Sequence, residues 1–167
     1  MRRPGRVRAG MGFVLGIILM VSFCGIIFHA IDLQTVDSFY PRLKDAYWIE
    51  PRYIEGLPRV GIASLEDLVQ KTKDKTERDE LALRLLIPRD ELIGWVEKAQ
   101  LCLLRGLGIR NLPLLERLGI TSVTDLAGKN PERLHIRLMQ AFPRGAVPSL
   151  AKIRIWVREA RKSIPKA

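Results

Sequence analysis

The sequence predicts an all-α protein, in which a single N-terminal transmembrane helix precedes a compact domain of two similar helical hairpin modules. Apolar residues recur at helical spacing from residue 56 onward, and no stretch sustains the alternation of a strand. Ser and Asn stand where helices would begin, and one short segment occurs twice. We divide the chain into a basic leader (1–10), a transmembrane helix (11–31), a juxtamembrane connector (32–55), the paired-hairpin domain (56–163) and a tail (164–167).

The membrane helix is predicted from residues 11–31, which contain no Asp, Glu, Lys or Arg. At 1.5 Å per residue, a helix of this length spans the roughly 30 Å hydrocarbon core. A cleaved signal peptide is the alternative, but Phe28 and Ala30 fit the small-residue cleavage rule poorly. A lipoprotein site at Cys24 is disfavoured by the bulky Phe23 before it. We therefore expect an uncleaved single-pass anchor.

The distribution of positive charge predicts the orientation of this anchor. The leader carries Arg2, Arg3, Arg6 and Arg8, whereas the connector carries few cations over a similar distance. Because Lys and Arg are enriched in cytoplasmic flanks, the N-terminus is expected in the cytoplasm and the domain outside it.

The connector is rich in aromatic residues, namely Phe39, Tyr40, Tyr47 and Trp48. Such residues favour the membrane interface, and packing against the domain is the alternative. Pro41 and Pro51 argue against one continuous helix here.

Helix signals follow one another through the first half of the domain. Ser64 and Asp67 form a capping pattern. Residues 71–80 are strongly charged and indicate a helix end and turn, after which a short buried helix is expected over 81–86. The next helix runs from Pro88 to about residue 105.

The second half repeats these signals. A helix over about 109–118 is predicted to stop at Gly119, and a short helix starts at Ser122. Asn130 opens a further helix that reaches about residue 142. The last helix begins near Ser149. Trp95 and Trp156 lie on apolar stripes and are expected to anchor the core.

An internal repeat relates residues 57–68 to residues 115–126, of which seven in twelve are identical without a gap. The identical pairs are Leu57/Leu115, Arg59/Arg117, Gly61/Gly119, Ile62/Ile120, Ser64/Ser122, Asp67/Asp125 and Leu68/Leu126. Two copies of one helix–stop–cap–helix unit predict two packed modules. Only the second copy is preceded by a Gly-X-Gly sequence, at 106–108.

Positive charge is concentrated in the C-terminal part, where residues 101–167 hold 13 Lys and Arg against 4 Asp and Glu. Residues 32–100 hold 11 against 14. The last helix contributes a basic surface of Lys152, Arg154, Arg158, Arg161 and Lys162. This surface would suit an anionic partner, and a merely solvated basic face is the alternative.

The Gly-X-Gly turn is the candidate contact site. Gly106 and Gly108 would let a phosphate approach the backbone at the start of a helix, and Arg105 and Arg110 could add charge-assisted contacts. Such contacts position nucleic acid without reading its bases. Close packing between two helices would explain the glycines equally well.

These residues resemble the helix-hairpin-helix superfamily, on Arg105-Gly-Leu-Gly-Ile109 followed by Leu112, Leu115 and Gly119-Ile120. More widely, the run from Leu57 to about Lys162 resembles an uncharacterised bacterial family of paired helix-hairpin-helix domains, a domain of unknown function. That family is similar to the C-terminal domain of the RNA polymerase alpha subunit. Leu112 departs from the pattern, which usually has a small residue there, and Glu116 would repel a phosphate.

A binding function is expected instead of catalysis, because no catalytic set, phosphate-binding loop or metal-ligand spacing occurs in the sequence. We expect no cofactor, no metal and no small-molecule ligand. The favoured function is a membrane-anchored adaptor that docks a protein partner, as an accessory subunit of a membrane complex. The alternative is a membrane-tethered protein that binds DNA without sequence specificity.

Overall fold

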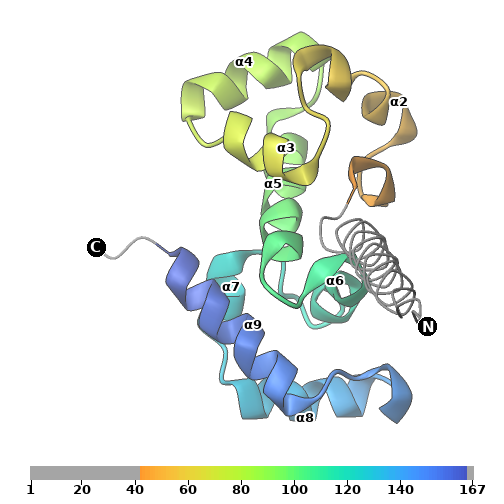
Figure 1. Cartoon of the computed structure of the whole chain (residues 1–167), viewed down its shortest axis with the longest axis vertical. Coiled ribbons are helices and arrows are strands. Elements are labelled where there is room, and N and C mark those ends of the chain that lie inside the picture. Colours follow the sequence, from red (N-terminus) through yellow and green to blue (C-terminus); the bar gives the residue numbers. More distant parts are fainter. Residues whose placement is uncertain (1–41, 165–167) are drawn as a thin grey trace, which may run out of the picture. The chain divides into compact units, whose positions relative to one another are not determined.

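The computed structural model describes residues 42–164 of the 167-residue chain. The predicted leader and transmembrane helix lie outside these residues, as do Phe39 and Tyr40 of the connector. The described part is helical and contains no strand, which confirms the all-α prediction for this part (Figure 1). None of its helices combines the length and the apolar character needed to cross a bilayer.

Eight α-helices and three short 3-10 helices (η) occur between residues 42 and 164. They are η1 (Leu43–Asp45), α2 (Pro51–Ile54), η2 (Leu57–Val60), α3 (Leu65–Lys71), α4 (Lys75–Leu85), α5 (Arg89–Leu103), α6 (Gly108–Glu116), α7 (Val123–Ala127), α8 (Pro131–Ala141), η3 (Arg144–Ala146) and α9 (Leu150–Ser163).

The repeated segment adopts the same conformation in both copies. Gly61 and Gly119 take left-handed φ angles of 76° and 73°, which glycine adopts without a steric penalty. The N–H of the following isoleucine then donates to the carbonyl five residues earlier, from Ile62 to Leu57 and from Ile120 to Leu115, each at 3.0 Å. The repeat in the sequence is therefore a repeat of backbone geometry.

Each copy continues into a capping box. The Ser64 hydroxyl accepts the N–H of Asp67, whose carboxylate accepts the Ser64 N–H in return, and Ser122 and Asp125 do the same. These reciprocal bonds satisfy two otherwise unpaired donors at the start of α3 and of α7. Both predicted helix starts are confirmed.

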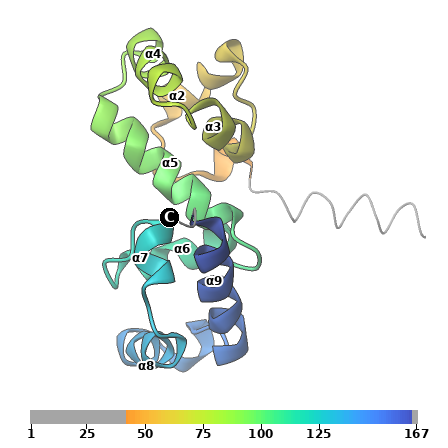
Figure 2. The ribbon, with the colours of Figure 1, turned by 90° about the vertical axis from the view of Figure 1, so that its left-hand side faces the viewer.

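The repeat extends beyond the segment that the sequence identifies. The order of helices α3, α4 and α5 is matched by α7, α8 and α9, and the third helix packs against the first in each set. Trp95 and Trp156 occupy the same place, seven residues after the N-cap of α5 and of α9, and both are buried as expected. Figures 1 and 2 show α2–α4 gathered at one end of α5 and α6–α9 at the other.

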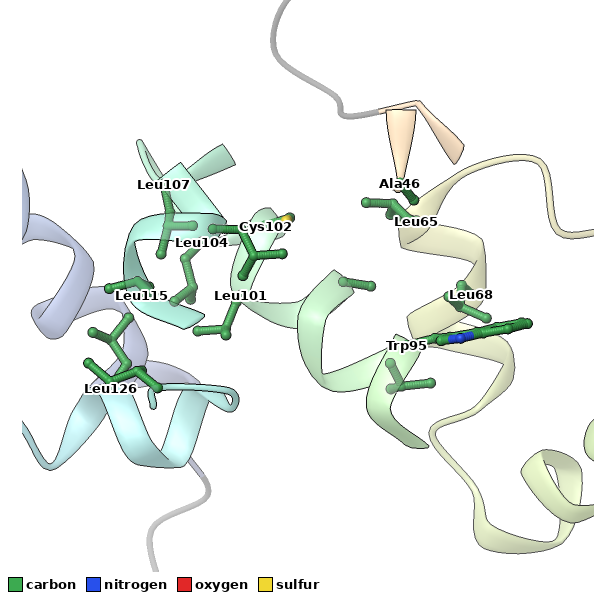
Figure 3. Close-up of a cluster of buried hydrophobic side chains, with 14 of the residues drawn as sticks. Ala46, Leu65, Leu68, Trp95, Leu101, Cys102, Leu104, Leu107, Leu115 and Leu126 are labelled. Carbon is green, nitrogen blue, oxygen red and sulfur yellow. The ribbon is translucent and has the colours of Figure 1, made fainter. Parts of the chain in front are cut away.

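The long helix α5 closes the first set, and the α5–α6 turn and α6 connect it to the second set. Near the start of α5, Trp95 lies beside Leu68 of α3 (Figure 3). Near its end, Leu101 and Cys102 belong to the same buried cluster as Leu115 of α6 (Figure 3). Its buried side chains therefore belong to one continuous core that runs through both repeats.

The described part of the connector packs into this core. Leu43, Ala46 and Ile49 are buried, and Trp48 is half-buried against the core. Of the two expectations for the aromatic residues, Trp48 follows the second, packing against the domain.

The sequence predicted a helix end and turn over residues 71–80 and a short buried helix over residues 81–86, and this prediction was wrong. One helix, α4, begins inside the charged run because the Asp74 side chain accepts the N–H groups of Thr76 and Glu77. Leu83 was expected to be buried but is exposed.

Candidate functional site

The turn between α5 and α6 contains the residues that the sequence singled out. The helix α5 ends at Leu103, and the chain then reverses through Gly106 and Gly108, with φ angles of 78° and 64°. A side chain at such a φ angle costs roughly 1–2 kcal/mol. Both glycines are therefore required by the backbone, whatever else they contact.

Two leucines hold this turn on the core. Leu104 and Leu107 are buried, and they lie beside Leu101 and Leu115 (Figure 3). The N–H of Leu107 donates to the Leu104 carbonyl at 3.0 Å. Because the leucines face inward, Arg105 and Gly106 are left exposed on the outer side of the turn.

Trp156 of α9 lies beneath the turn. A Cβ atom placed on Gly106 would be 3.7 Å from Trp156 Nε1. This indole is fully buried, and its N–H has no acceptor among residues 42–164. The second repeat's central tryptophan thus lies directly against the turn. Because a Cβ atom would fit on Gly106 at this distance and would meet nothing within 4 Å on Gly108, it is the left-handed backbone that requires the two glycines.

The start of α6 has no side-chain cap. Five helices of the described part begin at a residue whose side chain accepts a backbone N–H, namely Ser64, Asp74, Ser122, Asn130 and Ser149. At α6 the N-cap residue is the buried Leu107, which cannot cap. The first N–H groups of this nine-residue helix therefore lack the usual partner, and the helix dipole is positive there.

Arg105 and Arg110 flank this helix start. Both are exposed, and neither forms an ion pair or a side-chain hydrogen bond within residues 42–164. Their positive charges add to the positive potential that the α6 dipole gives to this helix start.

The acidic residue of α6 is held by other residues. Glu116 Oε1 lies 2.8 Å from Lys98 Nζ, and Glu116 Oε2 accepts a 2.6 Å hydrogen bond from the Tyr47 hydroxyl. Burial, followed by this hydrogen bond, raises the pKa of Tyr47. The repulsion expected from Glu116 is thus offset by Lys98, a contact that sequence spacing did not indicate.

Cys102 lies buried near the same carboxylate. Burial first, and then the charge of Glu116, raises the pKa of its thiol to about 12. The thiol therefore stays protonated at neutral pH and packs as a small apolar side chain.

The predicted basic surface of α9 is largely engaged within the domain. Arg154 pairs with Glu132 at 2.9 Å, and Arg158 and Lys162 both pair with Glu159, at 3.2 and 3.1 Å. These cations remain exposed, so their charge is only partly offset.

Arg161 has a structural role on the same helix. Its Nε and Nη2 atoms donate to the carbonyls of Ala127 and Lys129, at 3.0 and 3.1 Å. This satisfies carbonyls at the end of α7. Lys152 is exposed and forms no ion pair with a described residue.

One pocket in the described part is lined by side chains between residues 79 and 89, none of which belongs to this turn. It has a volume of about 290 Å³ and is lined by Asp79, Ala82, Leu83, Ile87 and Arg89. Within residues 42–164, no group of three or more His, Cys, Asp or Glu side chains could hold a metal ion.

Residues 42–164 form an all-α fold in which two copies of a three-helix unit, α3–α5 and α7–α9, are connected by a cationic turn and α6. The chain belongs to the family described as a domain of unknown function, DUF4332, whose model matches residues 48–163. No curated protein and no solved structure gives a significant match.

Proposed function

We propose that this chain is a membrane-anchored, non-catalytic protein that binds the sugar-phosphate backbone of DNA through a helix-hairpin-helix formed by α5, the α5–α6 turn and α6. The observation that carries the proposal is the uncapped start of α6 beside Arg105 and Arg110, which are exposed and have no ion-pair partner among the described residues. Backbone N–H groups at a helix start, together with arginine, are the groups that hold phosphate.

The distribution of paired charge supports this turn over α9 as the contact site. Most cations of the predicted basic surface already have partners in the domain, whereas Arg105 and Arg110 have none. The excess of cations over residues 101–167 supplies long-range attraction to a polyanion. Such binding is independent of base sequence.

The test measures the affinity of the full chain in nanodiscs for a fluorescent DNA duplex over a range of salt concentrations. Each phosphate contact contributes about 0.9 to the slope of log affinity against log salt. Arg105→Gln with Arg110→Gln is expected to weaken binding at least about tenfold and to reduce the slope by about 1.8.

A matched control distinguishes direct phosphate contact by Arg105 and Arg110 from the general effect of removing two positive charges. Arg133→Gln with Arg137→Gln removes the same charge from α8, where both arginines are exposed and unpaired within the described residues. Equal loss of affinity in both double variants, or no binding by the wild type at low salt, would refute the proposed site.

The membrane anchor remains part of the proposal. It is supported by the uncharged apolar run at 11–31 and by the four arginines before it. Membrane extraction with carbonate tests the anchor, and protease protection of the domain in inverted vesicles tests its orientation. Release by carbonate, or digestion of the domain in inverted vesicles, would reject the respective part.

A protein-docking adaptor is the second candidate, and the surface of α8 favours it. Ile136 and Met139 are 50% and 45% exposed and lie three residues apart on one helix. Co-purification in mild detergent after nuclease treatment tests it. A stoichiometric partner that is lost on Ile136→Ser with Met139→Ser supports the adaptor, and the same partner retained by the variant argues against this surface.

A further inference from the structure

Leu86 ends α4 in a backbone conformation that leucine rarely takes. Its φ and ψ angles are 52° and 40°, which is the left-handed region. Among the non-glycine residues of the described part, no other has a positive φ. The Cβ of an L-residue meets steric resistance there, so glycine or asparagine is the usual choice.

The chain itself provides the comparison. The N–H of Ile87 donates to the Ala82 carbonyl at 2.9 Å, which is the five-residue bond that also closes the stops at Gly61 and Gly119. In all three stops a buried isoleucine follows the left-handed residue. Glycine fills the position twice, and leucine fills it once.

Besides the backbone strain, Leu86 has an unfavourable apolar exposure, because its side chain is 85% exposed to water. Leu83, one turn earlier, is 75% exposed. These are the two most exposed large hydrophobic side chains of the described part. A strained backbone that presents an apolar side chain to water indicates a contact made with another molecule.

A pocket opens beside Leu83. It is formed by Ala82, Leu83 and Ile87, and by Asp79 and Arg89, which form an ion pair at 2.9 Å. Exposed Leu83 thus lines an open pocket of about 290 Å³, and the protruding Leu86 directly precedes Ile87, another of the lining residues.

We propose that this face, comprising Leu83, Leu86 and the pocket, is a dimer interface that binds a second copy of this chain. In a two-fold symmetric interface each patch meets itself, so a protrusion and a pocket on one face can fill each other reciprocally. Leu86 of each copy enters the pocket of the other copy.

The charge of this region suits a second copy. Residues 71–91 contain six Lys and Arg and six Asp and Glu, so two such surfaces meet without net repulsion. The strongly basic second half of the chain would instead repel its own copy. The sequence adds the pair Gly12-x-x-x-Gly16 in the apolar run, a spacing typical of helix pairs in membranes. The interface does not depend on the ligand of the α5–α6 turn.

The decisive variant is Leu86→Gly, measured on the full chain in detergent. Glycine relieves the left-handed strain and removes the protruding side chain. We expect its melting temperature in dilute solution to rise by about 3 °C. We expect the dimer dissociation constant, from sedimentation equilibrium, to rise at least about tenfold.

Two further variants test the same interface, one as a disrupting change and one as a control. Leu83→Glu places carboxylates on both sides of the symmetric contact and is expected to give monomers. Ile136→Ala removes exposed apolar surface from α8 and is expected to leave the dimer intact. A monomeric wild type, a dimer unaffected by Leu86→Gly, or a lowered melting temperature in that variant would each overturn the proposal.

Photo-crosslinking identifies the occupant directly. With p-benzoylphenylalanine in place of Leu86, irradiation of the full chain in native membranes should yield an adduct of twice the chain mass, attached within residues 79–89 of the second copy. An adduct with a different protein, or no adduct, would show that this face does not bind a second copy.

Discussion

The Tyr47 hydroxyl donates a 2.6 Å hydrogen bond to Glu116 Oε2, joining residues 69 positions apart in the sequence. Tyr47 belongs to the segment before the first repeat, and Glu116 ends α6 of the second. Lys98 of α5 holds the other carboxylate oxygen. Three parts of the described chain thus meet at the Glu116 carboxylate. Its charge is paired with Lys98, which offsets the repulsion of phosphate expected from Glu116.

Replacement of Tyr47 by phenylalanine tests this link. The variant loses one hydrogen bond to a charged acceptor, and because the site is partly exposed we expect about 1 kcal/mol of lost stability. Urea denaturation measures the change. Tyr53→Phe serves as the control, because the Tyr53 ring makes an edge contact with Trp95 and its hydroxyl has no hydrogen bond to a described residue. Equal destabilisation of both variants would show that the Tyr47 bond contributes nothing of its own.

The two capping boxes should make the domain sensitive to acid. Hydrogen bonding to Ser64 first, and then to the Ala63 N–H, lowers the pKa of Asp67. Ser122 and then Thr121 lower that of Asp125. Because the pKa of each carboxyl is lower in the folded state, the capping box contributes its full stabilisation above the pKa of an unfolded Asp, about 3.9. This stabilisation is lost as the pH falls through the lower pKa of the folded state.

The measurement compares cap variants at two pH values. Ser64→Ala or Ser122→Ala should cost about 1 kcal/mol at pH 7, and the cost should become smaller as the pH falls below the unfolded carboxyl value of about 3.9. Ser149→Ala is the control, because its capped residue is Lys152 and no carboxylate is involved. If the stability lost in Ser64→Ala and Ser122→Ala is as independent of pH as that lost in Ser149→Ala, the capping boxes are not the source of the acid sensitivity.

The local features of the fold followed from the sequence. Cap residues, glycine stops and buried tryptophans are read from residues within one turn of helix, and the structure has them at Ser64, Gly119 and Trp156. Asp74 was missed because its cap lies inside a charged run, where an acidic residue has no distinctive neighbour.

The contacts of the candidate site did not follow from the sequence. The Gly-X-Gly turn was found, but the approach of Trp156 to this turn and the link between Glu116 and Tyr47 involve residues far apart in the chain. The matching of α5 with α9 was also missed, because the offset between the copies changes from 58 in the repeated segment to 61 at the tryptophans, and only three-dimensional packing reveals it.

Substitution of Gly108 by alanine isolates the backbone requirement of the turn. A Cβ atom at this position meets nothing within 4 Å, so the left-handed φ of 64° is the sole cost. We expect a loss of about 1 kcal/mol in the free energy of unfolding. Gly94→Ala is the matched control, since its Cβ also meets nothing and Gly94 lies inside α5. That change should stabilise the domain by about 0.5–1 kcal/mol, and a stabilising Gly108→Ala would show that the turn relaxes without strain.

Arg161→Met separates structure from binding on the basic helix α9. The variant loses both bonds to the carbonyls of Ala127 and Lys129, and we expect a loss of about 1 kcal/mol, visible in thermal denaturation. Arg158→Met removes the same charge from an exposed pair with Glu159 and should change stability by less than about 0.5 kcal/mol. Because neither arginine is placed at the α5–α6 turn, both variants should weaken DNA binding equally and only slightly. A larger loss of affinity for Arg158→Met than for Arg105→Gln would move the binding site from the turn to α9.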